Sequence, residues 1–354
     1  MESRERFIST LFVKPADKIP LFEFLDSQNL FEHLTGVRPA SYDTKLAVDC
    51  CFKLGFDAVW APFGGISAFA DEESSGKDIY VDEWGVTYKK TEFSWPCDSP
   101  IAFPVKTQKD LDKITVPDAG RPDRLIDIKK ALELTDGKMA VIGGICGPFT
   151  IVYLGMGYEG LSIATIDDPG LIHNFHEIAA DFLIKAAKQM IGAGVDVVYI
   201  GEDLGFNTAP FLSPQQFRKF TFPHLKKLIA TIRENNVPVI LHSDGNLNLI
   251  LEDIVEMGIN ALNPIEANAH MDLKEIKKRY GKNICLLGGI NNDVLCNGTP
   301  EMVEKEVKRV IDIAGPGGGF IPASDSGDFR NEMPLENVLA AVEAIKKYKD
   351  FQDS

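Results

Sequence analysis

The chain has 354 residues, 45% of them hydrophobic, which allows a large core and falls in the usual range of a single (β/α)8 barrel with insertions. Its formal net charge of −15, without a cluster of lysine and arginine, excludes nucleic acid as an expected partner. No apolar run approaches the roughly 20 residues that span a bilayer, and the polar N-terminus has no signal core. We therefore expect a cytoplasmic protein that does not enter the membrane.

Short apolar runs alternate with amphipathic helical patterns along the chain. Strands that alternate with helices form a parallel sheet, and no second core is detectable. We therefore expect eight strands closed into a (β/α)8 TIM barrel, in one α/β domain that spans residues 1–354. The expected strands are residues 18–24, 56–60, 139–144, 195–201, 237–242, 259–265, 284–289 and 319–323.

Residues 62–136 separate the second and third expected strands by far more than a loop and one helix. Within them, DIYVDEWGVTYKKTEF (residues 78–93) alternates polar and apolar residues around Gly85, which predicts a β-hairpin. Insertions on barrel loops are usually lids or substrate-facing elements. We therefore expect the hairpin over the barrel mouth, with Trp84 and Tyr88 binding substrate. The alternative for an aromatic hairpin is packing alone.

Polar side chains follow the later strands, where the chemistry of such barrels gathers. They are Glu202 and Asp203 after residues 195–201, His242 and Asp244 after 237–241, Asn263 and Glu266 after 259–262, and Ser324 and Asp325 after 319–323. Carboxylates this close repel one another unless a cation or shared protons relieve them. We therefore expect a divalent-metal site of His242, Asp244, Glu202 and Glu266. Catalysis is assigned to His242, Asp244 and Asp203, and substrate binding also to Asn263 and Asp325.

These residues also have plainer structural explanations. A histidine that ends a strand can hydrogen-bond the next loop, and Asp244-Gly245 can form an ordinary turn. Asp203 can cap a loop, and the side chains of Glu202 and Glu266 can point outward. Six scattered cysteines form no CxxC pair, and no nucleotide-binding glycine motif or G-x-S-x-G elbow is present. Three further histidines are predicted on exposed helix surfaces: His33, His173 and His176.

Five stretches together resemble the uroporphyrinogen decarboxylase superfamily over nearly the full length of the chain. They are DEWGVTYKKTEFSWP (82–96), GEDLGFNTAPFLSPQQFRKFTFPHLKKLI (201–229), LHSDGN (241–246), LLGGIN (286–291) and GPGGGFIPAS (315–324). Each stretch alone is weak, whereas the set is specific. The resemblance implies a (β/α)8 barrel with its active cleft at the carboxyl face.

The superfamily divides by chemistry, and the resemblance favours its corrinoid-dependent methyltransferases. True uroporphyrinogen decarboxylases grip the porphyrinogen carboxylates with an arginine-rich loop after the first strand, and residues 24–31 here contain no arginine. Coenzyme M methyltransferases hold zinc with a His-x-Cys pair and a later cysteine. His242 matches that histidine, whereas Asp244 and Gly318 stand at the cysteine positions. A site of histidine and carboxylates is harder than a thiolate site, as suits an O-demethylase methyltransferase.

We therefore expect transfer of a methyl group from a methoxylated or similar small donor to Co(I) on a corrinoid protein. That protein is a separate one, because the chain has no Asp-x-His-x-x-Gly motif for B12. A divalent metal at His242, with zinc as first candidate, or a protonated acid there would neutralise the leaving oxygen. Two alternatives stay open. One is a decarboxylase of uroporphyrinogen or a related substrate, in which Asp203 stabilises a protonated ring, and the other is a non-catalytic ligand-binding barrel. The sequence also leaves a homodimer open.

Overall fold

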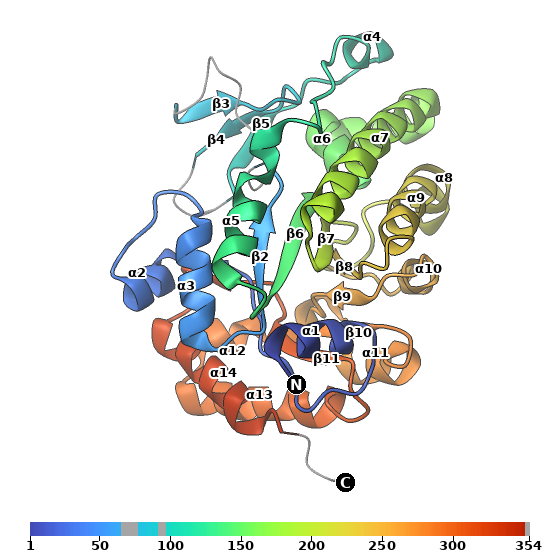
Figure 1. Cartoon of the computed structure of the whole chain (residues 1–354). Helices are drawn as coiled ribbons and strands as arrows, with labels where there is room; N and C mark the ends of the chain where they lie inside the picture. The colour runs from blue at the N-terminus through green and yellow to red at the C-terminus, as the bar shows by residue number, and fades with distance from the viewer. Residues whose placement is uncertain (65–76, 91–96, 351–354) are drawn as a thin grey trace.

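The computed structural model describes residues 1–64, 77–90 and 97–350, and its centre is a curled sheet of seven parallel strands in the order β11-β10-β9-β8-β7-β6-β2 (Figure 1). Seven of the eight expected strands are thereby confirmed, each within a few residues. The strands are β2 (Ala58–Pro62), β6 (Ala140–Cys146), β7 (Val197–Gly201), β8 (Val239–His242), β9 (Ala261–Asn263), β10 (Cys285–Ile290) and β11 (Phe320–Ser324).

The first expected strand, residues 18–24, is not a regular strand, yet its backbone fills the gap between β2 and β11. Asp57, beside β2, donates its N–H to the Leu21 carbonyl at 2.8 Å, and the Leu21 N–H donates to the Asp57 carboxylate at 2.7 Å. On the other edge, the Ser324 N–H donates to the Glu23 carboxylate at 2.5 Å. Side-chain oxygens thus replace part of the backbone ladder, and the segment takes the eighth place of a TIM barrel.

Every second residue of the barrel strands points into the barrel. These inward side chains are small or branched, and Phe7 and Leu11 of α1 (Ser3–Leu11) join the same core at the amino end of the strands. The strand alternation repeats every two residues. It therefore aims a second set into the barrel mouth, two residues beyond inward-facing core positions: Trp60 after Ala58, Tyr199 after Val197, His242 after Ile240 and Asn263 after Ala261.

The outer layer is a shell of helices that surrounds the sheet (Figure 1). Many of these helices begin at a residue whose side chain accepts a backbone N–H of the first turn, such as Asp168, Asp272 and Thr299. The remaining helices are α2 (Gln28–Thr35), α3 (Thr44–Leu54), α4 (Gln108–Leu111), α5 (Ile126–Thr135), α6 (Pro148–Asp167), α7 (Pro169–Ala193), α8 (Pro214–Phe220), α9 (Phe222–Arg233), α10 (Leu251–Glu256), α11 (Leu273–Tyr280), α12 (Asn292–Asn297), α13 (Pro300–Ala314) and α14 (Leu335–Tyr348).

Helix α6 is long and apolar enough to cross a membrane by length and composition, so the expectation that no segment reaches that length was wrong. In the structure, 56% of its apolar window is buried, and it packs along α7. Its apolar residues therefore pack within the outer helical layer of the barrel. His176 of α7 is a second correction, because it is fully buried, with ring nitrogens 2.9 Å from the Ile172 carbonyl and 3.0 Å from the Thr221 hydroxyl.

The predicted hairpin after the second barrel strand is confirmed. Strands β3 (Ile79–Val81) and β4 (Thr87–Lys89) pair in antiparallel fashion, and Tyr80 lies opposite Tyr88. Gly85 has a φ of +85°, which its place in the turn requires. A third strand, β5 (Ser99–Ala102), pairs with β4 and was not predicted, since its four residues show no polar alternation. Residues 91–93 of the expected hairpin lie outside the described residues.

Candidate active site

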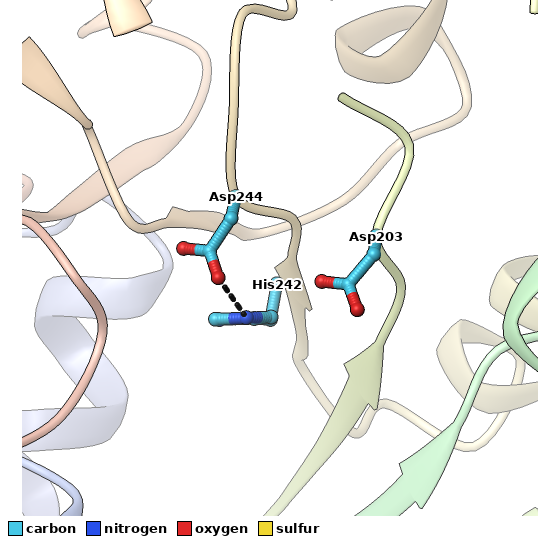
Figure 2. Close-up of side chains that lie close together, drawn as sticks. All are labelled: Asp203, His242 and Asp244. Carbon is cyan, nitrogen blue, oxygen red and sulfur yellow. Dashed lines mark ion pairs between the residues drawn. The ribbon is translucent and has the colours of Figure 1, made fainter. Parts of the chain in front are cut away.

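Asp203, His242 and Asp244 come together at the carboxyl ends of β7 and β8 (Figure 2). Each offers one potential ligand atom, and these atoms all lie within 4.8 Å of one another. Asp244 Oδ2 is 3.7 Å from His242 Nε2. Gly201 is the register partner of His242, so the residues that follow the two strands emerge side by side. Parallel pairing thus assembles the cluster expected from the strand ends.

Asn263, at the end of β9, fixes the ring of His242. Its Oδ1 lies 2.8 Å from His242 Nδ1, while its Nδ2 donates to the Leu287 carbonyl at 3.2 Å. An amide oxygen only accepts hydrogen bonds, so Nδ1 carries a proton and Nε2 faces the two carboxylates. A metal-binding histidine is commonly held in this way through its second nitrogen. Asn263, predicted to bind substrate, is fully buried and instead positions His242.

The electrostatics of the cluster favour a positive charge between the carboxylates. Burial alone would lower the pKa of His242, but the Asp244 carboxylate, with Asp203 and Asn263, raises it to about 9. Burial and Asp244 also raise the pKa of Asp203, against the opposing effect of His242. Asp244 Oδ1 is buried and has no hydrogen-bond partner among the described residues. A divalent cation would satisfy that oxygen and replace the proton on Nε2, so the donor set fits a metal.

A cavity of about 350 Å³ opens in front of the cluster. Its walls are aromatic and acidic. The aromatic lining comprises Phe24, Trp60, Tyr88, Tyr153 and Tyr199, and the carboxylates are Asp26, Asp98, Asp203, Asp244 and Asp328. Arg330 is the only lysine or arginine that lines it in the part of the chain that the structure describes. The volume suits a small organic molecule.

Two expected metal ligands are not part of this cluster. Glu202 is fully buried beneath the start of α6, where it accepts the backbone N–H groups of Phe149 at 3.1 Å and Thr150 at 2.8 Å. Glu266 accepts the N–H of Gly245 at 2.7 Å. Both carboxylates are therefore engaged by backbone donors, and they position the loops that follow β6 and β8.

Asp325, expected to bind substrate, is also buried away from the cavity. Its carboxylate accepts the backbone N–H of Asn292 at 2.7 Å and that of Ala267 at 3.1 Å. These contacts join the loops that follow β9, β10 and β11. The geometry gives Asp325 a role in holding the barrel mouth in shape.

The hairpin contributes Tyr88 to the cavity wall, but it does not contribute Trp84. Trp84 is 7% exposed and packs edge-on against Phe182 of α7, with ring centroids 5.2 Å apart. It lines a separate space of about 40 Å³ beside the main cavity. Trp60 of β2 faces the cavity instead, and the strand alternation could have identified it.

We predict that Trp84→Ala lowers the free energy of unfolding by about 3–5 kcal/mol, because it removes a buried aromatic side chain. Denaturant unfolding measures this loss. Trp60→Ala is the matched variant, and we expect it to weaken binding of a cavity ligand in a titration. A ligand affinity that falls with Trp84→Ala, without loss of stability, would contradict this assignment and restore Trp84 to substrate binding.

The segment after β11 contains site residues that were not predicted from the sequence. Gly318 precedes β11, so it lies at the opposite end of that strand from His242 and cannot replace a ligand there. The residues beyond the strand approach instead: a Cβ on Gly327 would lie 2.9 Å from His242 Cε1. Ser326, Asp328 and Arg330 line the same cavity. The polar run SDSGDFR (324–330) continues past the end of the strand and could have indicated these residues.

Comparisons with known proteins identify the family of the chain. The family described as uroporphyrinogen decarboxylase (URO-D) matches residues 94–348. The methylcobamide:CoM methyltransferases MtaA of Methanosarcina barkeri and MtbA of Methanosarcina mazei are 26% and 27% identical, and each alignment covers 98% of both chains. A uroporphyrinogen decarboxylase of Hydrogenovibrio crunogenus is 28% identical over 68% of this chain and 69% of that protein. These relatives are enzymes.

Among solved structures, a methyltransferase from Methanosarcina mazei has the same fold. It superposes with a TM-score of 0.78 at 23% sequence identity, covering 98% of this chain and 99% of that one. This similarity extends over nearly the full chain and confirms the TIM-barrel class.

Proposed function

The chain belongs to the uroporphyrinogen decarboxylase family, and from that premise we propose that it is an enzyme that transfers a methyl group from a small, methoxylated donor to the corrinoid of a separate protein. The observation on which the proposal rests is the cavity in which the Asp203–His242–Asp244 cluster meets aromatic walls. Methyltransferase relatives that align over 98% of the chain add support.

The charge of the cavity disfavours decarboxylation of uroporphyrinogen. That substrate is octa-anionic, whereas the described lining contains five aspartates and one arginine. Asp26 stands in the very stretch where a decarboxylase has its arginine-rich loop, so that stretch brings an acidic side chain and no guanidinium to the cavity. Like charges in a partly buried site repel strongly. A neutral or weakly charged donor of small size is the better match.

Breaking an O–CH3 bond leaves the bonding electron pair on oxygen, so the site must neutralise a developing negative charge. A divalent metal, with zinc as first candidate, would be held by Asp203, His242 and Asp244 and would supply Lewis acidity to that oxygen. Asn263 keeps His242 Nε2 directed at the site. The Tyr153 hydroxyl donates to Asp203 Oδ2 at 3.1 Å and holds that carboxylate in place.

The aromatic walls would orient the donor and exclude water. Tyr199 and Phe24 lie with ring centroids 5.0 Å apart, and Tyr199 also lies beside His242, with centroids 5.6 Å apart. A flat donor against these rings would present its methoxy group to the cluster. The methyl group must then face the open side of the cavity, where a partner protein can bring its corrinoid.

The direct test mixes this protein with a corrinoid protein reduced to Co(I) and a panel of methoxylated compounds. The expected result is methylation of the corrinoid, followed by its absorbance, with an equal amount of demethylated product. Carbon dioxide release from a porphyrinogen, with no methylation by any donor, would support the decarboxylase instead. Tight donor binding without turnover of either kind would support a binding barrel.

A further inference from the structure

A second polar group lies in the same cavity, on the seam where the barrel closes. Strand β1 (Leu25–Asp26) pairs in parallel with β12 (Phe329–Arg330), and Asp26 is the register partner of Arg330. Asp328 directly precedes β12. The side chains of Asp26, Asp328 and Arg330 all line the cavity that contains His242. The seam therefore brings two carboxyl groups and one guanidinium to the candidate active site.

The β1–β12 pairing sets Asp26 opposite Arg330, two residues after Asp328, so the two carboxyl groups lie in the same wall of the cavity. Two ionised carboxylates that share a partly buried site repel each other, so the pair favours a proton on one of them. Arg330 Nε donates to Asp328 Oδ1 at 2.5 Å, and Arg330 also donates to the Ser326 carbonyl at 3.3 Å. The guanidinium favours the ionised form of Asp328. The proton of the pair is therefore assigned to Asp26.

The electrostatics agree with this assignment. Burial raises the pKa of both carboxyl groups, and the Asp328 carboxylate raises that of Asp26 further, whereas Arg330 opposes the rise at both groups and also hydrogen-bonds to Asp328. Among the described residues, the other titratable groups that act on the pair come from several walls and bring no further cation. They are Glu23 before β1, Tyr42 before α3, Cys97 before β5, Tyr199 of β7 and Asp244 after β8.

The proposed reaction needs a proton donor that the His242 cluster does not supply. The Nδ1 proton of His242 is held by Asn263, and a metal on Nε2 would displace the only other proton of that ring. The hydroxyl of Tyr153 donates to Asp203. Asp26 is a carboxylic acid in the same cavity, and Arg330 stabilises its partner Asp328 as a carboxylate.

We propose that Asp26, which lies with Asp328 in the cavity wall, is the general acid that protonates the leaving oxygen of the methyl donor. The inference rests on the proposed function. The donor O–CH3 bond breaks, the methyl group joins the reduced corrinoid of the partner, and the bonding pair stays on oxygen. That oxygen takes the Asp26 proton and leaves as a phenol or alcohol. Asp26 becomes a carboxylate and regains a proton from water.

Methyl aryl ethers of graded leaving-group acidity test this role. A donor whose phenol is weakly acidic needs the proton, whereas a nitrophenol leaves as a stable anion. Asp26→Asn is expected to slow transfer from the weakly acidic series by about 100- to 10,000-fold and from nitrophenyl ethers by less than about tenfold. Asp328→Asn should show the same dependence, because it removes the partner of the pair.

Asp98→Asn is the matched control, since it removes a carboxylate from the same cavity whose contact is the Tyr80 hydroxyl at 2.9 Å. Its effect is expected to be equal across the donor series. An equal loss across the series for Asp26→Asn would overturn the acid role. A wild-type protein that demethylates no ether would overturn the proposed function and the acid role together.

A measurement that needs no activity tests the proton itself. Infrared difference spectra of wild type against Asp26→Asn should contain the C=O stretch of a protonated carboxyl group at neutral pH, and Asp98→Asn should not alter that band. Asp26→Glu, which keeps an acid, should restore it. Thermal unfolding confirms that each variant folds. The absence of this band from the wild-type difference spectrum would overturn the proposal, whatever the outcome of the transfer assay.

Discussion

Replacement of His242 by alanine is expected to lower the rate of methyl transfer by about 100-fold or more, with a much smaller change in KM for the donor. In the proposed mechanism, the side chain stabilises charge on the leaving oxygen, directly or through a metal, and that charge develops only in the transition state. Single-turnover transfer to a reduced corrinoid protein measures the chemical step. Metal content by elemental analysis, in the same preparations, measures the second expected loss.

His33→Ala is the control for this experiment, because His33 is exposed on α2, outside the cavity lining. It should retain both the rate and the metal. The transfer rate and metal content of Asn263→Ala should fall between those of the two variants, since this change releases the ring of His242 without removing Nε2. Equal metal content in wild type and His242→Ala would remove His242 as a ligand, and an unchanged transfer rate would remove it from the mechanism.

The metal-free protein is expected to lose up to about 3 kcal/mol of its unfolding free energy between pH 6.5 and 9 through His242. Its pKa is raised to about 9 in the folded state from an ordinary 6.5, and the side chain is only 15% exposed. Within that window the folded protein binds more protons than the unfolded chain. Stability therefore falls as pH rises, and the contribution of His242 is fully present below pH 6.5.

Denaturant unfolding across this pH range, with and without added zinc, checks the sign. The difference between wild type and His242→Gln isolates the histidine from the other titrating groups and should shrink toward pH 9 in the metal-free state. A metal needs the unprotonated Nε2, so stabilisation by zinc should grow over the same range. A difference that stays constant with pH would show that Asp244 and Asp203 do not hold a proton on His242.

The main site cluster was predictable because it depends on a short-range rule. Parallel strands end together, and side chains alternate, so an inward position at Ile240 determines an inward position at His242. The residues immediately after neighbouring strands then meet. That rule does not predict which carboxylates accept hydrogen bonds from backbone N–H groups. Glu202 therefore looked like a ligand, although three hydrogen bonds from Phe149 and Thr150 engage it.

Asp26 and Asp328 could not be found in that way. The segment before Asp26 lacks the regular pattern of a strand because the side chains of Asp57 and Glu23 accept the backbone N–H groups of Leu21 and Phe24. Asp328 lies four residues beyond the end of β11 at Ser324, where strand alternation no longer applies. The pairing of β1 with β12 is what brings the two together, and a two-residue pairing leaves no periodic signal.

The closing seam also constrains when the active site can form. Glu23 and Ser324, joined across it, are separated by 301 positions along the chain. Contacts this distant are costly in chain entropy and form slowly, so local helices and early strand pairs precede them. A growing polypeptide on the ribosome can assemble β2 and β6 to β10 and still lack a cavity wall. The Asp26–Asp328 pair can form only after β12 has been synthesised. The proposed activity therefore begins only then.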